Sequence, residues 1–224
     1  MKIDQLKNLL NDFGEDVKFN FDLKKKNWFN IGGKSKVFFK AVNLKNLVNF
    51  LKKLNNQEKI FILGAGSNLF ITDNIFDGVV IRLGKDFNNI SCLNDDILIA
   101  GSGVLDKSLS EFAMNNNLSG FEFLSCIPGT VGGGIKMNAG CFGKEFKDIL
   151  LSVQAIDKSG NVITIPKKDI LFDYRKNNLS SDLIFLSASF KGKKSNFLKI
   201  KKEINMLKAK KNKNQPTKIK TSGS

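Results

Sequence analysis

Residues 127–143 read IPGTVGGGIKMNAGCFG and hold six of the 19 glycines of this 224-residue chain. The segment is apolar and almost uncharged, whereas flexible linkers are rich in serine and other polar residues. We expect Val131, Ile135 and Met137 to be buried. Glycines let a flat or bulky object lie against the backbone, so the segment predicts a bound cofactor, with a closely packed core turn as the alternative.

A second glycine segment, GAGSN at residues 64–68, follows the short apolar run KIFIL at residues 59–63, which is typical of a buried strand. Consecutive backbone N–H groups in such a loop can bind phosphate oxygens, and Ser67 and Asn68 add side-chain donors. The dinucleotide pattern G-x-G-x-x-G fails because its last position is Leu69. No P-loop lysine follows either, so the two segments favour a nucleotide that is bound and not hydrolysed. A turn without a ligand is the alternative.

A third candidate is FDYR at residues 172–175, which contains the only tyrosine of the chain and one of its two arginines. Arginine presents a rigid planar fork to a carboxylate, which lysine does not. We therefore predict that Arg175 contacts an anionic ligand. The alternative is a structural ion pair with a nearby acid.

The composition excludes several classes of protein. Without histidine, neither a Ser-His-Asp nor a Cys-His catalytic system can be built. Three scattered cysteines cannot complete a four-cysteine zinc site, and no metal is predicted. Sparse cysteines fit a reducing compartment, so we expect a cytoplasmic protein. No apolar run approaches the ~20 residues of a membrane span, and no membrane partner is expected.

The net charge of +15 is concentrated at one end, because residues 191–224 hold twelve lysines and a single acid, Glu203. A basic tail can bind nucleic acid. Readers of base sequence favour arginine, however, and this chain has only two arginines. A solvated helix face is therefore the better interpretation, and we expect no nucleic-acid partner.

Hydrophobic periodicity predicts a mixed α+β body, and we expect two parts that meet near residue 82. Asn43 is a candidate N-cap, and Ser159-Gly160-Asn161 supplies the turn of a β-hairpin. The predicted helices span 1–12, 43–54, 105–117 and 195–213, and the hairpin joins 150–157 to 162–166.

The order of the motifs resembles that of the UDP-N-acetylenolpyruvoylglucosamine reductases, from about residue 18 to residue 224. These motifs are NWFNIGG (27–33), LGAGSNLF-x2-D (63–73), FLSCIPGTVGGGIKMNAG-x2-G (123–143), FDYR (172–175), NQP (214–216) and SGS (222–224). The combination of the second and third motifs is the most specific part of the resemblance.

The resemblance implies an FAD-binding fold of two α+β subdomains, of the vanillyl-alcohol-oxidase and CO-dehydrogenase-flavoprotein type. The first subdomain would span residues 1–82 and the second residues 83–194. Residues 195–224 would form a basic helix and a linker into a C-terminal substrate domain that the sequence lacks.

The resemblance also implies the cofactor, FAD, with NADPH as the co-substrate that reduces it. FAD would lie between the two glycine segments. The residues implied to contact FAD are Gly64, Ala65, Gly66, Ser67, Asn68, Pro128, Gly129, Thr130, Gly132, Gly133, Asn138 and Gly140.

The implied reaction reduces UDP-N-acetylglucosamine enolpyruvate to UDP-N-acetylmuramate in peptidoglycan precursor synthesis. Arg175 matches the arginine that activates the substrate, where it would stabilise charge developing on oxygen. Ser224 matches the serine that donates a proton to C2. The family usually has serine where this chain has Asn177.

The sequence stops at Ser224, where the family continues into a substrate domain that carries a catalytic glutamate. We therefore expect this chain to bind FAD at most and to lack reductase activity by itself. Another small flavoprotein oxidase of the same fold and a basic nucleic-acid-binding module are the alternatives. The sequence makes no prediction of oligomeric state.

Overall fold

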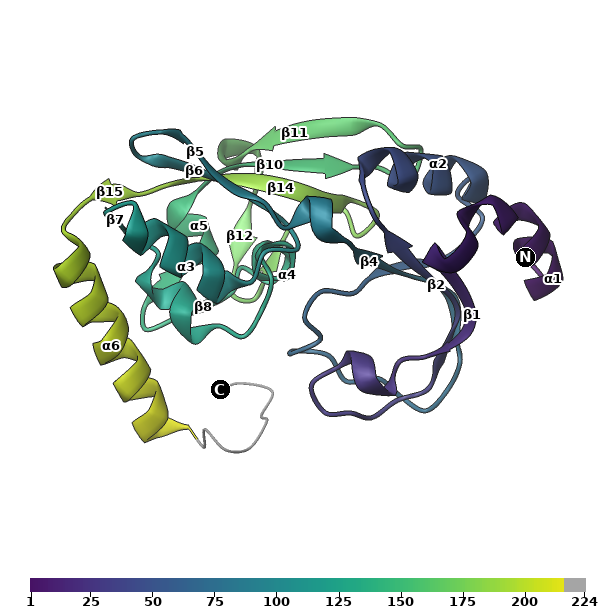
Figure 1. The fold of residues 1–224 in the computed structure, drawn as a ribbon, viewed down its shortest axis with the longest axis horizontal. Coiled ribbons are helices and arrows are strands. Elements are labelled where there is room, and N and C mark those ends of the chain that lie inside the picture. Colours follow the sequence, from purple (N-terminus) through teal and green to yellow (C-terminus); the bar gives the residue numbers. More distant parts are fainter. Residues whose placement is uncertain (216–224) are drawn as a thin grey trace.

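The computed structural model describes residues 1–215, which are divided between two main β-sheets and the helices that cover them (Figure 1). The α-helices in this part of the chain are α1 (Ile3–Leu9), α2 (Leu44–Leu54), α3 (Asp106–Asn115), α4 (Val131–Lys136), α5 (Phe146–Ile149) and α6 (Phe197–Asn214). The strands are β1 (Val17–Asp22), β2 (Lys34–Ala41), β3 (Ile60–Ile62), β4 (Phe76–Leu83), β5 (Ile90–Asn94), β6 (Ile97–Gly101), β7 (Leu118–Ser119), β8 (Gly140–Cys141), β9 (Lys144–Glu145), β10 (Leu150–Ile156), β11 (Val162–Pro166), β12 (Phe172–Asp173), β13 (Lys176–Asn177), β14 (Ile184–Lys191) and β15 (Lys193–Lys194).

The first sheet has the strand order β1-β2-β4-β3, with β2, β4 and β3 parallel and β1 antiparallel to β2. Its central strand β4 is buried on both faces. Val79 and Ile81 pack in the core cluster that contains α1 and α2, whereas Val80 packs on the opposite face with Phe38 and Leu63. This double burial explains the uninterrupted apolar run of β4, because a parallel strand covered on both sides needs no polar face.

Helix α2 confirms the helix predicted over 43–54. The Asn43 side chain accepts a hydrogen bond from Asn46 N at 2.8 Å, which satisfies one of the free N–H groups at the start of the helix. The helix ends at Asn55, whose φ of 45° is left-handed. On the buried face, the Phe50 ring stacks on Phe39 of β2 with centroids 3.7 Å apart. This contact fixes α2 on the first sheet.

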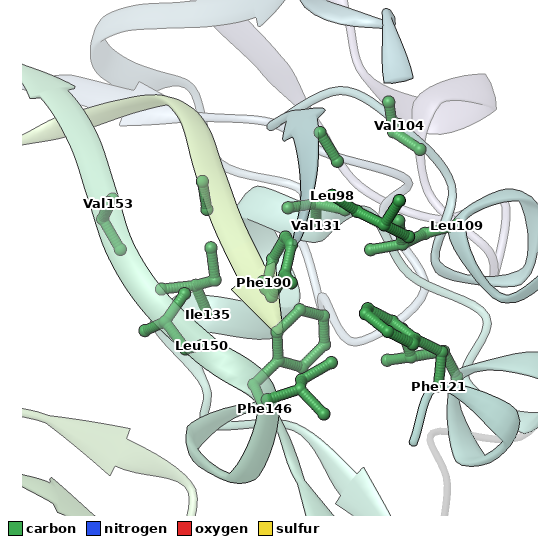
Figure 2. Close-up of a cluster of buried hydrophobic side chains, with 14 of the residues drawn as sticks. Leu98, Val104, Leu109, Phe121, Val131, Ile135, Phe146, Leu150, Val153 and Phe190 are labelled. Atoms are coloured by element: carbon green, nitrogen blue, oxygen red, sulfur yellow. The ribbon is translucent and has the colours of Figure 1, made fainter. Parts of the chain in front are cut away.

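The second sheet is antiparallel throughout and has the order β11-β10-β14-β6-β5. Strands β10 and β11 pair directly, which confirms the predicted hairpin. Helices α3, α4 and α5 supply apolar side chains to the core that covers this sheet, among them Leu109, Val131 and Phe146. Figure 2 shows Phe146 of α5 beside Phe190 of β14, whose ring centroids are 5.9 Å apart.

The 127–143 segment forms α4 and the turn that follows it, and it lies in this second core. Val131 and Ile135 are fully buried as predicted, but Met137 is only half-buried because it caps the end of the helix. A Cβ on Gly134 would overlap the ring of Phe146. The close packing of α4 on Phe146 therefore explains why position 134 is a glycine.

The two sheets share apolar contacts. The first sheet ends at Leu83 and the second begins at Ile90. The core cluster around α2 also takes in Phe87, Ile156 and Leu186, the last two from strands of the second sheet. The division at residue 82 stays a prediction. Residue 82 lies near the end of β4, just before the chain leaves the first sheet.

The basic helix α6 confirms the helix predicted over 195–213 and buries Ile200 and Ile204. It stands at the edge of the second sheet's helical layer (Figure 1). Ser224 and the end of the NQP motif lie outside the described residues. Within residues 1–215, no helix combines the length and apolarity needed to cross a membrane.

Candidate functional site

The two predicted glycine segments meet in space although they are far apart in the sequence. A Cβ on Gly64 would lie only 2.7 Å from Thr130 Oγ1. Two backbone hydrogen bonds to residues 102–104 hold the second segment in place. Val131 N donates to Val104 O at 2.9 Å, and Gly132 N donates to Ser102 O at 2.8 Å. The fold therefore places a loop of the first sheet against the start of α4.

The backbone N–H groups of residues 64–68 donate no hydrogen bond to any acceptor within residues 1–215. The N–H group of the exposed Gly133 is also unused in the described part of the chain. Neither segment contains a carboxylate. Such a row of free N–H groups is the donor set that suits an anion, above all phosphate oxygens. The chemistry of the residues present thus fits the pyrophosphate of a dinucleotide.

The 64–68 loop packs against the NWFNIGG motif, whose first residue is the buried Asn27. The Asn27 side chain donates to Leu23 O at 3.1 Å and to Ile31 O at 2.6 Å. Trp28 N donates to Gly66 O at 2.9 Å. Gly66 has a φ of 69°, and a Cβ there would lie 2.5 Å from the carbonyl oxygen of Lys26. This position therefore requires glycine.

Trp28 is a candidate that the sequence analysis missed. Its indole Nε1 is buried and has no hydrogen-bond partner in the described residues. A buried donor without an acceptor is uncommon in folded proteins and calls for an explanation, such as an ordered water. The only signal in the sequence was its place in the NWFNIGG motif, which does not show that the Trp28 backbone bonds to Gly66.

The glycines of the second segment differ in what an added side chain would meet. A Cβ on Gly129 would lie 2.5 Å from Asp106 Oδ2, and one on Gly132 would lie 2.9 Å from Ser102 Cβ. At Gly133 the nearest atom would be Thr130 Oγ1 at 3.5 Å. Packing therefore accounts for Gly129 and Gly132, and Gly133 alone of these three leaves open space for a ligand.

Asp106 is the most unusual side chain near the site. It begins α3, is fully buried, and neither carboxylate oxygen has a hydrogen-bond partner within residues 1–215. Burial raises the pKa of this carboxyl well above its usual range. Sequence reasoning missed Asp106, since an aspartate at a helix start is ordinarily exposed.

Replacing Asp106 by Asn is expected to stabilise the protein at pH 7 by about 1–2 kcal/mol. The raised folded-state pKa means that wild-type stability is greatest below the unfolded pKa and falls as pH rises through the folded pKa. The advantage of the variant should therefore vanish near pH 3.5, roughly the range of an ordinary aspartate. Urea unfolding of the variant and the wild type at pH 7 and at about pH 3.5 measures the difference in the free energy of unfolding.

Ser110→Ala is the matched control for Asp106→Asn. Ser110 lies one turn later on α3, is buried, and its hydroxyl also lacks a partner in the described residues. It does not titrate, so its effect on the free energy of unfolding should be the same at both pH values. A difference between Asp106→Asn and wild type that stays constant with pH would contradict the account of Asp106.

Arg175 lies in the two-residue turn between β12 and β13 with a left-handed φ of 58°. Its Nη1 donates to Gly140 O at 3.2 Å, and its guanidinium carbon lies 5.2 Å from the centre of the Tyr174 ring. Arg175 forms no ion pair with an acid within residues 1–215, which removes the alternative of a structural salt bridge. Its charge is thus free to meet an anionic ligand.

Two asparagines hold the Arg175 hairpin against α4 and the turn that follows it. Asn138 is fully buried and donates to Glu145 Oε2 at 3.1 Å and to Asp173 O at 3.2 Å. Asn177 donates to Ile135 O at 2.8 Å, at the end of α4. Both amide protons of Asn138 are used inside the protein, so the geometry gives it a positioning role and adds no support for its predicted contact with FAD.

The other residues predicted to contact FAD differ in their exposure and contacts. Pro128, Ala65 and Asn68 are exposed, and Ser67 is partly exposed beside them. Gly140 pairs with Glu145 through β8 and β9, and its carbonyl receives Arg175. The described residues contain no group of three or more His, Cys, Asp or Glu side chains that could hold a metal ion.

Comparison with known proteins identifies the chain. Residues 35–166 match the family described as an FAD binding domain. A protein from Pelagibacter ubique (strain HTCC1062), named UDP-N-acetylenolpyruvoylglucosamine reductase, is 61% identical over all 224 residues, which cover 74% of its own length. The crystal structure of UDP-N-acetylenolpyruvylglucosamine reductase from Thermus caldophilus aligns with a TM-score of 0.79 and 27% identity, over 92% of this chain and 72% of that one.

A more distant solved structure defines the fold type. 4-Ethylphenol oxidase from Gulosibacter chungangensis aligns with a TM-score of 0.60 and 13% identity, over 86% of this chain and 43% of that one. At this identity the likeness shows the fold alone. The predicted FAD-binding α+β fold of the vanillyl-alcohol-oxidase type is confirmed, and the alternative of a small flavoprotein oxidase is not favoured. The chain belongs to the UDP-N-acetylenolpyruvoylglucosamine reductase family.

Proposed function

We propose that this chain binds FAD between residues 64–68 and residues 128–133 and takes part in the NADPH-dependent reduction of UDP-N-acetylglucosamine enolpyruvate to UDP-N-acetylmuramate. One observation carries the proposal: two glycine segments meet at Gly64 and Thr130, and the N–H groups of residues 64–68 and of Gly133 are unused within residues 1–215. Bound FAD would supply the transfer of a hydride from NADPH to the enolpyruvyl group. A cytoplasmic location is part of the proposal and rests on the sparse, unpaired cysteines.

The protein's own contribution to cofactor binding is a set of neutral donors. The N–H groups of 64–68 and of Gly133 would donate to the pyrophosphate oxygens. These groups are fixed before the cofactor arrives, because Asn27 holds the supporting loop and Ser102 holds the second segment. Little ordering is then needed on binding.

Arg175 is proposed to stabilise negative charge that develops on the substrate carboxylate. Its guanidinium is oriented by Gly140 O and the Tyr174 ring, and no acid within residues 1–215 neutralises it. A charge held in place in this way stabilises an enolate oxygen without reorganisation. Ser224 would return a proton to C2, and its position lies outside the described residues.

Activity is expected only when further sequence is present. The 224 residues match 74% of the Pelagibacter reductase, and no acid of this chain can be assigned the role of the predicted glutamate. The 224-residue polypeptide alone should show no NADPH oxidation that depends on the enolpyruvyl substrate. A fusion to the part of the Pelagibacter protein left unmatched, predicted to be C-terminal, should show it. Activity of the unfused polypeptide, or none in a folded, flavin-loaded fusion, would count against the proposal.

Arg175→Lys in that fusion is expected to lower turnover roughly 100-fold, because lysine keeps the charge but loses the planar fork and its hold on Gly140 O. The flavin content should stay unchanged. Lys176→Arg is the matched control, since Lys176 lies next in the hairpin and pairs with Asp173 on the surface. Equal turnover in the Arg175→Lys variant and in the wild type would remove Arg175 from the reaction.

A further inference from the structure

Two of the three cysteines flank residues 127–140, which contain the second glycine segment. Cys126 directly precedes Ile127, and Cys141 directly follows Gly140. Cys126 ends the 3-10 helix η4 (Glu122–Cys126), and Cys141 lies on β8, which contacts η4. The fold therefore brings the two ends of the segment back together.

The two cysteines lie on elements that contact each other. The Cys141 Sγ donates at 3.2 Å to Phe123 O, and Phe123 lies one turn before Cys126 in η4. Cys126 is buried and Cys141 is only partly buried, so an oxidant as small as peroxide can reach the pair from the side of Cys141. The third cysteine, Cys92, is exposed on β5.

The surroundings of the pair are cationic. The nearby Cys141 thiol lowers the pKa of the Cys126 thiol, and Lys211 and Lys208 of α6 lower it further. Lys211 Nζ also donates to Cys126 O at 2.7 Å, which fixes α6 beside the pair. The influence of Cys126 and burial raise the pKa of Cys141. The site thus favours one thiolate beside one thiol, as in reactive dithiols.

We propose that Cys126 and Cys141 form an oxidisable dithiol that hydrogen peroxide converts to an intramolecular disulfide joining the two ends of residues 127–140. The Cys126 thiolate attacks one peroxide oxygen, the O–O bond breaks, and Cys126 becomes a sulfenic acid as hydroxide leaves. The Cys141 sulfur then attacks the Cys126 sulfur, the S–O bond breaks, and water leaves with the thiol proton. In sum, two thiols and one peroxide give one disulfide and two waters.

The test uses the purified 224-residue chain, fully reduced and then treated with one equivalent of hydrogen peroxide at pH 7. The expected product is a monomer lighter by two hydrogen atoms, with one free thiol in place of three. Peptide mapping should join Cys126 to Cys141 and leave Cys92 free. Dithiothreitol should restore all three thiols.

Serine variants distinguish the roles of the three cysteines. Cys141→Ser should stop at a sulfenic acid on Cys126 that dimedone traps, and Cys126→Ser should form no intramolecular disulfide. Cys92→Ser, the matched control, should behave as wild type. The proposal is overturned if folded wild-type protein keeps all three thiols, or if its only disulfides join separate chains through Cys92.

Discussion

Gly134→Ala is expected to lower the free energy of unfolding by about 2–3 kcal/mol, one of the two largest effects that the structure predicts. Gly134 lies on α4 where a Cβ would overlap the ring of Phe146. Phe146 cannot move aside easily, because it is fully buried and its ring packs against Phe190 (Figure 2) and also against Phe123. Inserting a methyl group there must displace either the helix or the ring. Urea unfolding followed by circular dichroism measures the loss.

Gly133→Ala is the matched control, since it makes the same substitution one residue earlier on the same helix. A Cβ on Gly133 would meet nothing nearer than Thr130 Oγ1 at 3.5 Å. Alanine also favours the helix over glycine, so this variant should be unchanged or more stable by up to about 1 kcal/mol. Equal destabilisation by the two variants would show that the packing of Gly134 on Phe146 is not the cause.

Gly66→Ala is expected to weaken FAD binding by roughly 100-fold, which corresponds to the loss of two or three hydrogen bonds of about 1 kcal/mol each. The added Cβ would lie 2.5 Å from Lys26 O and 2.8 Å from Asn27 Cα, and the φ of 69° disfavours any side chain. The loop must then shift away from Asn27, which turns the N–H groups of 64–68 from their common direction. Titration of the folded variant with FAD, followed by flavin fluorescence, measures the change.

Gly14→Ala separates backbone strain from crowding. Gly14 also has a positive φ, 50°, but a Cβ there would have nothing within 4 Å. It should cost about 1 kcal/mol of stability through strain alone and leave the affinity for FAD unchanged. A Gly66→Ala variant that binds FAD as tightly as Gly14→Ala would contradict the role given to the 64–68 loop.

Much of the fold could be predicted because its signals are local. The N-cap at Asn43 and the turn at Ser159-Gly160-Asn161 fix their elements within a few residues, and the structure has both α2 and the β10–β11 hairpin. The burial of Val131 and Ile135 follows from the spacing of apolar residues on one helix face. The motif order also indicated the cofactor class, which the family match confirms.

What could not be predicted depends on contacts between distant segments. Whether Gly129 serves a ligand or the core is decided by Asp106, a residue of another helix. The same holds for Asn138, which looks like part of the flavin motif but binds the Arg175 hairpin through Asp173 O. The Cys126–Cys141 pair likewise exists only because β8 returns to η4.

The measurement that tests the central claim most directly is a titration of the purified 224-residue chain with FAD. The account predicts one bound FAD per chain, with a dissociation constant of about 1 μM or tighter, and a flavin absorbance band that stays with the protein after gel filtration. The same sample must show a cooperative unfolding transition, so that binding is judged on folded protein. A folded chain that stays colourless at saturating FAD would contradict the claim that residues 64–68 and 128–133 form a flavin site.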